Sequence, residues 1–568
     1  MSTLDWLVLF GTLSFIVLYG TWKSRGSNVE SFLKGDQQLK WWMIGVSIMA
    51  TQASAVTFLS TPGQAIEDGM RFIQFYFGLP LAMVIISITM LPIYYKLKVY
   101  TAYEYLETRF DLKTRTLAAI LFLILRGLSA GITLFAPSLV LSTILGWNIF
   151  FTTLLIGALV IIYTVSGGSK AVSITQRYQM TVILAGMAMA GIIAFTLLPT
   201  DISFLDTVRV AGELGKLNIV TTDFKLSDRF NIWSGLLAST FLFLSYFGTD
   251  QSQVARYLGG KSLTESRMGL IFNGLLKIPM QFLILFIGVL VFVFYLFNQP
   301  PVFHNQVLVE QARQTQKGTS IDSLQLDFNR AFYEKKVAVL KLVKSIHDND
   351  RQEIEEAKKS YRVFQRKEDS IKTLTKYSIA EGMNLSIKKV KDTDYIFLNF
   401  VLKYLPHGVV GLLLAVIFSA AMSSMASELS ALASTTTVDV YKRIVKGNTE
   451  SSHYLVSSKW FTVLWALLAM GFAMLANFAE NLIQYVNIVG SLFYGTILGI
   501  FLVAFYFKRV KSDAVFWAAL VAESVVLACY FYFYQEIAFL YYNIIGCGVV
   551  VMLSAIFQSV LNYRHSHN

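Results

Sequence analysis

The chain has 568 residues, of which 55% are hydrophobic and only 15% are charged, and its mean hydropathy is +0.55. Because a soluble domain carries about a quarter charged residues, this composition excludes a soluble globular protein and indicates a membrane protein with many spans in the lipid bilayer. The formal net charge of +12 follows from the loops between those spans, so we expect no nucleic-acid partner.

About thirteen apolar segments are long enough to cross a bilayer, at about 20 residues for each crossing. The first segment has no cleavage-like motif of small residues after it and is too long for a typical signal peptide, so we expect it to be a span. Cys529 and Cys547 lie in late spans, which argues against a disulfide framework or a thiolate metal site. The segments lie near residues 4–22, 41–60, 72–95, 116–145, 149–166, 176–198, 232–252, 268–298, 395–425, 456–478, 482–506, 513–534 and 538–561.

Lysine and arginine are concentrated in the loops that follow odd-numbered spans, and the short loops between them contain few of either residue. The positive-inside rule therefore predicts a multi-pass protein of the cell (inner) membrane with an extracytoplasmic N-terminus and a cytoplasmic C-terminus. The basic residues behind this argument are Lys23, Arg25, Lys34, Lys40, Lys96, Lys98, Arg109, Lys113, Arg115, Arg256, Lys261, Arg267, Lys442, Arg443, Lys446, Lys508, Arg509, Lys511 and Arg564.

A patch of small polar residues at 51–55 interrupts the second apolar segment. Every backbone polar group in lipid needs an internal partner, so a loosened helix persists only where it faces protein or a watery cavity. Discontinuous helices in transporters expose carbonyls that coordinate Na⁺. We therefore expect carbonyl ligands for a cation near Ala50 and Ala53.

The chain becomes polar between residues 299 and 394. Aromatic and aliphatic residues recur there three and four positions apart, at Tyr333, Val337, Leu340 and Val343, which is typical of an amphipathic helix. The alternation of spans predicts that this insertion is extracytoplasmic. A solvated helical hairpin that caps the outer face is one interpretation. A lid, or a docking site for an unknown partner, is the other, and no specific motif supports it.

A second patch of small polar residues, at 419–427, lies in the ninth apolar segment. On a helix, Ala420, Ser423 and Ser424 share one face. Two hydroxyls and a nearby carbonyl make half of an oxygen cage that suits Na⁺, a small hard cation, and the first patch supplies the other half. Close packing of small residues between helices is the alternative interpretation. The presence of both patches in one many-span chain favours a site halfway across the membrane.

Several stretches together resemble the sodium/solute symporter family, in its branch that carries monocarboxylates, vitamins and iodide. The resemblance runs over roughly residues 1–298 and 395–560 and implies an all-α polytopic protein. Its expected fold is a five-plus-five inverted-repeat (LeuT-like) core with about three additional helices and the N-terminus outside. The stretches that carry the resemblance are 41–45, 101–110, 136–139, 163–171 with its turn at 166–170, 419–427 and 438–442.

The family's sodium site uses two carbonyls on the first broken helix, and a carbonyl and two hydroxyls on the eighth core helix. This is the set that the spacing indicates independently. Sugar carriers of the family also place a carboxylate on the fifth core helix, where this chain has Gln176, so a carboxylate-dependent second sodium is in doubt. The sodium ligands that the resemblance implies are Ala50, Ala53, Ala420, Ser423 and Ser424.

The resemblance also implies a solute pocket. At positions where galactose-type carriers grip sugar hydroxyls with polar residues, this chain has mainly aromatic and aliphatic ones. Aromatic walls, few acceptors and one ammonium suit a small organic anion better than a polyol, since hydroxyls require paired partners. Tyr246 is the candidate gate, as a ring with one hydroxyl can both seal a pocket and hydrogen-bond. The candidate solute-binding residues are Thr57, Tyr76, Phe243, Lys277 and Asn487.

Four further ionisable residues lie in apolar segments. Lys277 either pairs with a solute carboxylate or tunes the pocket, or it lies at the membrane surface or in a structural ion pair. We expect structural roles for Arg126 and Glu523. Asp250 is either part of an inner gate or a solvated helix end. We expect no buried carboxylate in the core that is placed to relay a proton, although proton coupling stays open.

The sequence therefore predicts a sodium-coupled symporter that imports a small organic anion such as a monocarboxylate by alternating access, with Na⁺ as the coupling ion and no other cofactor. The alternatives are a symporter for a sugar, polyol or amino acid, and less so a transporter-like sensor or a channel. No His, Asp or Cys cluster indicates an enzyme. The expected parts are 1–40 (extra span and loop), 41–298 (first repeat and start of the second), 299–394 (insertion), 395–506 (rest of the second repeat) and 507–568 (extra spans).

Overall fold

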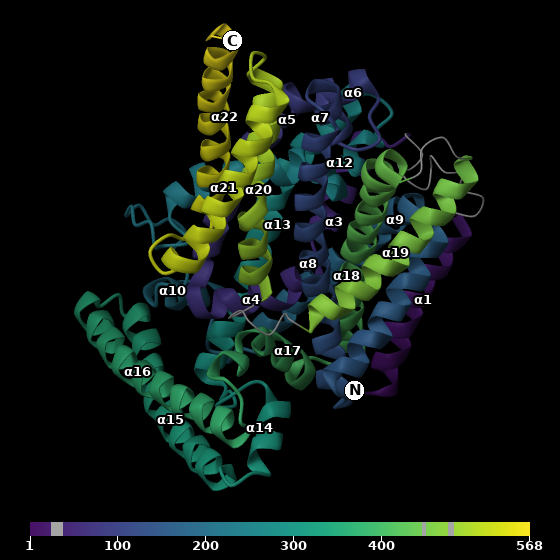
Figure 1. The fold of residues 1–568 in the computed structure, drawn as a ribbon. Helices are drawn as coiled ribbons and strands as arrows, with labels where there is room; N and C mark the ends of the chain where they lie inside the picture. The colour runs from purple at the N-terminus through teal and green to yellow at the C-terminus, as the bar shows by residue number, and fades with distance from the viewer. Residues whose placement is uncertain (24–37, 446–449, 475–481, 568) are drawn as a thin grey trace.

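The computed structural model describes residues 1–23, 38–445, 450–474 and 482–567. These residues are helical apart from loops and one isolated bridge between Leu39 and Gly260. The long helices run side by side in one bundle, with the N-terminus at one end and the C-terminus at the other (Figure 1).

The first part of the bundle alternates long helices with short, broken ones. Its elements are α1 (Thr3–Lys23), α3 (Trp41–Gln52), α4 (Ala55–Asp68), η1 (Gly69–Tyr76), α5 (Leu79–Ile88), α6 (Met90–Leu97), α7 (Glu104–Arg109), α8 (Leu112–Leu145), α9 (Ile149–Thr196), α10 (Phe204–Glu213), η2 (Ser234–Ala238), α11 (Ser239–Gly248), α12 (Gln251–Leu258) and α13 (Leu263–Phe297).

The second part begins with the polar insertion and returns to the bundle. Its elements are α14 (Gln306–Arg313), α15 (Gly318–His347), α16 (Arg351–Gly382), η3 (Ile387–Lys389), α17 (Thr393–Tyr404), α18 (Val409–Thr435), η4 (Thr436–Val445), α19 (Ser451–Ala473), α20 (Leu482–Tyr506), α21 (Ser512–Phe533) and α22 (Tyr541–His567).

Within the described residues, 9 helical segments are long and apolar enough to cross a membrane. Three shorter apolar segments, Thr3–Tyr19, Ile149–Val165 and Ser234–Gly248, add to them. The sequence predicts about thirteen spans, which is more than this number of long helices. The difference arises mainly where a predicted span consists of shorter helices, as at α3, which has 12 residues. The protein is thus an all-helical polytopic membrane protein, and a count by length alone underestimates crossings made of broken helices.

The spans expected at 149–166 and 176–198 both fall within α9, which runs over Ile149–Thr196. The turn at 166–170 that contributed to the family resemblance lies outside the residues whose side chains the structure describes.

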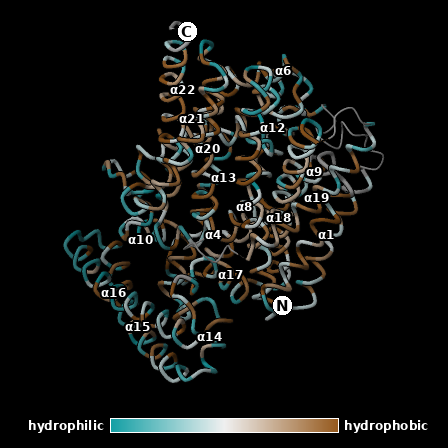
Figure 2. The backbone as a smooth tube through the Cα atoms, in the orientation of Figure 1, coloured by the Kyte–Doolittle hydropathy of each residue, from teal (hydrophilic) through white to brown (hydrophobic). Residues whose placement is uncertain are grey.

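The insertion folds as the short helix α14 and a hairpin of two long helices, α15 and α16 (Figure 1). It lies at the same end of the bundle as the N-terminus, and its hairpin is mostly hydrophilic (Figure 2). The hairpin encloses an ion pair between Lys335 and Glu368, both of which are buried. A second apolar cluster, separate from the main core, joins α14 to this hairpin.

The position of α18 is fixed at its start by α1. The carboxylate of Asp5 accepts hydrogen bonds from the N–H groups of Gly408 at 2.6 Å and Gly411 at 3.3 Å. A negative charge stabilises a helix N-terminus, where these N–H groups have no helical partner. A Cβ at position 411 would lie 2.2 Å from the carbonyl oxygen of Asp5, so glycine permits the close approach. From there α18 runs without interruption between α8, α9, α3 and α4.

Candidate functional site

Helices α3 and α4 meet at a break formed by Ala53 and Ser54. The N–H of Ser54, which a continuous helix would direct to the carbonyl of Ala50, donates instead to Gln52 at 3.0 Å. The N–H of Thr57, which would reach the carbonyl of Ala53, donates to Ser54 at 2.9 Å. The break thus releases the carbonyls of Ala50 and Ala53, both fully buried residues, from helical hydrogen bonding.

The released backbone faces the serine pair of α18. The hydroxyl of Ser423 donates to the carbonyl of Ala50 at 3.1 Å, and the hydroxyl of Ser424 donates to the carbonyl of Thr51 at 3.0 Å. Both serines are buried, as is Ala420, which precedes them by one turn. The two patches singled out in the sequence therefore lie side by side. The carbonyl of Thr51 is a participant that the sequence argument missed, because helix periodicity does not show which carbonyls a break releases.

This arrangement has the chemistry that a sodium ion requires. Its donor atoms are neutral carbonyl and hydroxyl oxygens, which hard cations prefer. A hydroxyl that donates to a carbonyl can rotate its hydrogen away and offer a lone pair to a cation. Of the ligands predicted from the sequence, the structure brings Ser423 to Ala50 and Ser424 to the neighbouring Thr51, and it buries the other two, Ala53 and Ala420.

A neutral polar network supports this region from α9. The side-chain oxygen of Gln176 accepts a hydrogen bond from Ser47. Its side-chain nitrogen donates to the hydroxyls of Thr51 at 2.9 Å and Ser427 at 3.1 Å. Ser427 in turn donates to the carbonyl of Ser423 at 2.9 Å. The amide thus connects α3, α9 and α18 without adding a charge.

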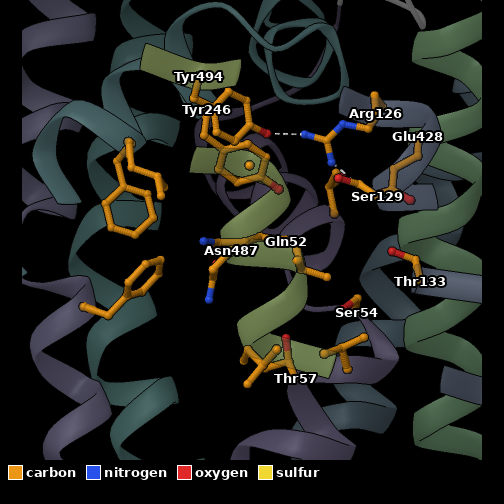
Figure 3. Close-up of a pocket in the computed structure, with 18 of the residues that line it drawn as sticks. Gln52, Ser54, Thr57, Arg126, Ser129, Thr133, Tyr246, Glu428, Asn487 and Tyr494 are labelled. Carbon is orange, nitrogen blue, oxygen red and sulfur yellow. Dashed lines mark hydrogen bonds and ion pairs between the residues drawn. The ribbon is translucent and has the colours of Figure 1, made fainter. Parts of the chain in front are cut away.

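A cavity lies beside the helix break (Figure 3). It includes four of the five solute-binding residues expected from the sequence, namely Thr57, Tyr76, Phe243 and Asn487, and also the expected gate residue, Tyr246. The full lining is Thr51, Gln52, Ser54, Val56, Thr57, Phe75, Tyr76, Arg126, Ser129, Thr133, Leu242, Phe243, Tyr246, Glu428, Ile483, Val486, Asn487, Gly490 and Tyr494.

Tyr246 lies at the end of the cavity opposite Thr57, next to Tyr494 (Figure 3). Its hydroxyl accepts a hydrogen bond from the side chain of Gln253 at 2.6 Å. Its ring centroid lies 5.4 Å from the guanidinium carbon of Arg126. The ring therefore lines this end of the cavity, and its hydroxyl is hydrogen-bonded.

Arg126 has a different position from the one expected. We predicted a structural role in the helix bundle, but its guanidinium lines the cavity. It forms ion pairs with Asp250 and, at 3.0 Å, with Glu428, and it donates to the hydroxyl of Tyr494 at 2.5 Å. Asp250 is 1% exposed, so it is not a solvated helix end. A charged residue in a span is by default a functional candidate, so its place in the cavity wall makes Arg126 a candidate for solute binding as well.

Lys277 also departs from the expectation, because it is not among the residues that line the cavity. It is 0% exposed on α13, with its ammonium 5.9 Å from the ring centroid of Tyr76, whose side chain does line the cavity. Within the described residues its ammonium has no hydrogen-bond partner. It reaches neither a membrane surface nor an ion pair, and the aromatic wall separates it from a solute in this conformation.

Glu428 is a cavity residue that the sequence argument missed. It follows Ser427 directly, at the end of the second patch, and it is 6% exposed. Its side chain faces Arg126 across one end of the cavity (Figure 3). The expectation about proton coupling did not take this buried core carboxylate into account. The signal was available, since an ionisable residue in an apolar span calls for a partner.

Comparisons with known proteins identify relatives of this chain. The sequence profile of the Sodium:solute symporter family matches residues 32–316 and 373–522. Human sodium-coupled monocarboxylate transporter 1 is 31% identical over 273 residues, or 47% of this chain and 44% of that transporter, so the match spans less than half of the relative. The sodium/sialic acid symporter SiaT of Proteus mirabilis (strain HI4320) is 25% identical over 566 residues, or 97% of this chain and 94% of SiaT.

A solved structure shares the fold. It is a substrate-bound, outward-open state of a Na⁺-coupled sialic acid symporter, and it matches with a TM-score of 0.73 at 22% sequence identity. The match covers 98% of both chains. The arrangement of helices around the break and the cavity is thus that of a known transporter fold.

Proposed function

The chain belongs to the sodium:solute symporter family, and from that premise we propose that it couples the inward movement of Na⁺ to the import of a small organic solute. One observation carries the proposal. The helix break that receives the hydroxyls of Ser423 and Ser424 also supplies Thr51, Gln52 and Ser54 to the cavity wall. An ion held at the break would therefore organise the solute site directly.

Binding of ion and solute is reciprocal in this mechanism. Na⁺ joins α3 and α4 to α18, and each ligand raises the affinity for the other, typically by about 1–3 kcal/mol. The two repeats of the five-plus-five core then rock, with Tyr246 as the inner gate, and Na⁺ leaves into the cytoplasm. A membrane potential of about 100 mV adds roughly 2.3 kcal/mol for each charge that moves inward.

The solute that fits best is a small organic anion. Arg126 brings a guanidinium to a cavity otherwise lined by aromatic, aliphatic and uncharged polar side chains, with Glu428 as the exception. The relatives described above carry monocarboxylates and sialic acid by name, which are both carboxylates. Gln52, Thr57 and Asn487 also suit a sugar, polyol or amino acid, which is the second candidate class.

The orientation that we propose places the N-terminus and the 299–394 insertion outside the cell and the C-terminus in the cytoplasm. It rests on the lysines and arginines of alternate loops. The placement of the insertion and the N-terminus at one end of the bundle, opposite the C-terminus, is consistent with it (Figure 1). Import then proceeds toward the end of the cavity formed by Tyr246 and Tyr494.

The test is uptake into liposomes that contain the purified protein. Lactate, sialic acid and glucose are offered with an inward Na⁺ gradient or an equal K⁺ gradient. We expect saturable uptake of at least one of the two carboxylates, only with Na⁺, and faster with an inside-negative potential. Carboxylate uptake that is equal in Na⁺ and K⁺ would contradict sodium coupling. Uptake of glucose alone would favour the second candidate class.

A further inference from the structure

At one end of the cavity, a single guanidinium is paired with two carboxylates. Among the described residues that line the cavity, Arg126 is the only cation and Glu428 the only carboxylate, and Arg126 is shared with the carboxylate of Asp250 behind it. These side chains are buried, with residue exposures of 4%, 6% and 1%. If all three were ionised, the group would hold one uncompensated negative charge away from water.

Such a charge is costly. Removing an ion from water costs several kcal/mol, and a single guanidinium cannot fully offset two carboxylates. When two carboxylates share one site, one of them tends to keep its proton. The other titratable neighbours are tyrosines, which supply neutral hydroxyls and no compensating charge: Tyr246 and Tyr494 beside Arg126, and Tyr103 and Tyr257 near Asp250. Lys277 lies outside the cavity wall and pairs with neither carboxylate.

The hydrogen bonds decide which carboxylate holds the proton. Asp250 accepts four donors: the N–H of Ser252 at 2.9 Å, its hydroxyl at 2.7 Å, the hydroxyl of Tyr494 at 2.8 Å, and Arg126. Donors of this kind stabilise the ionised form. Glu428 has fewer donors: its carboxylate accepts from Arg126 at 3.0 Å and from the hydroxyl of Thr133, while Oε2 has no partner in ordinary hydrogen-bond geometry among the described residues.

We propose that Glu428 carries a proton on Oε2 when the transporter binds an anionic solute, so that solute uptake is linked to proton uptake at this site. The idea rests on the proposed function for its solute class. A protonated Oε2 is a donor, and the Nε of Arg126 is a second buried donor without a partner among the described residues. Two donors at one end of the cavity suit a carboxylate, whereas an ionised Glu428 repels it.

Linkage gives the expected size of the effect. An anion that binds only to the protonated form loses affinity about tenfold for each pH unit above the titration of Glu428. Glu428→Gln keeps a neutral donor of similar shape, so its affinity should not change with pH in this way. Sodium binding involves other residues and should remain in the variant.

The experiment uses infrared difference spectra of the purified protein in lipid bilayers during a pH titration in Na⁺. We expect a carbonyl stretch of a protonated carboxylic acid that disappears as pH rises, is missing in Glu428→Gln and persists in Glu523→Gln, a matched buried glutamate outside the cavity. If Glu428→Gln does not fold, Glu428→Asp should shift this band rather than leave it unchanged.

A spectrum that is identical in wild type and Glu428→Gln would overturn the inference, because Glu428 would then be ionised throughout. Uptake of lactate and sialic acid with the same pH dependence in both proteins would overturn its link to transport. Failure of the proposed function is distinguishable, since it would abolish the difference between Na⁺ and K⁺ in the wild type. That result would not affect the infrared band.

Discussion

Replacing the serine pair of α18 with alanine should weaken sodium binding by a large and calculable factor. In Ser423→Ala/Ser424→Ala, the two hydroxyls that contact the carbonyls of Ala50 and Thr51 at 3.1 and 3.0 Å are lost. An interaction between a hydroxyl and a charged group contributes about 1.5–3 kcal/mol. The loss of both ligands should therefore cost about 3–6 kcal/mol, which at 1.4 kcal/mol per tenfold change is roughly 100-fold to 10⁴-fold in affinity.

The assay is the thermal midpoint of the purified protein, measured as Na⁺ replaces K⁺ at constant ionic strength. A ligand that binds the native state raises stability with its concentration, so the titration reports the affinity. Ser434→Ala is the matched control, because Ser434 is a buried serine of the same helix whose hydroxyl bonds only to the carbonyl of Ala431. A folded double variant with the Na⁺ affinity of wild type would refute the reasoning.

Three other substitutions test the remaining features. Arg126→Gln should abolish carboxylate uptake and leave Na⁺-dependent stabilisation in place; undiminished uptake would show that the guanidinium does not bind the solute. Lys277→Met should raise the thermal midpoint, because a buried ammonium without a partner is replaced by an apolar side chain of similar size, and should leave solute affinity unchanged. A large fall in solute affinity would instead place Lys277 in the binding site. Burial raises the pKa of Asp394, at the start of α17, to about 6, compared with about 3.9 in an unfolded chain. Folding therefore favours the protonated carboxyl of Asp394. Its contribution to the stability of the folded protein is fully present below about pH 4 and is lost as the pH rises through about 6. In the wild type the thermal midpoint should therefore fall over this pH range, and Asp394→Asn should remove the fall. Parallel pH profiles of wild type and variant would show that Asp394 is not the group responsible.

The contact between the helix break and the serine pair could be predicted from the sequence because its signal is local. Small polar residues in an apolar segment indicate a break, and helix periodicity places Ser423 and Ser424 on one face. The structure brings both serines to the break, and the buried Ala50 receives one of them. Whether the Thr51 carbonyl takes part depends on the relative axial position of the two helices, which no local sequence pattern specifies.

The charged residues of the cavity were harder to predict, for a physical reason. Arg126 and Lys277 are both single cations in apolar helices, and the sequence gives no information about how each helix is rotated against its neighbours. The structure turns Arg126 toward the cavity and leaves Lys277 behind Tyr76. Glu428 was missed although its neighbours were recognised, because its role depends on α8 and on Asp250, more than a hundred residues away in the chain.

The central claim is that one Na⁺ binds between the break of α3 and α4 and the serine pair of α18, beside a solute that contacts Arg126. The most direct measurement is a high-resolution structure determined in NaCl with a transported carboxylate, and again in KCl. The account predicts ion density among the oxygens of Ala50, Ala53, Ala420, Ser423 and Ser424 in NaCl only, with the carboxylate within hydrogen-bonding distance of Arg126. A solute-bound structure in NaCl with no ion between these helices, or with α3 and α4 joined in one unbroken helix, would contradict it.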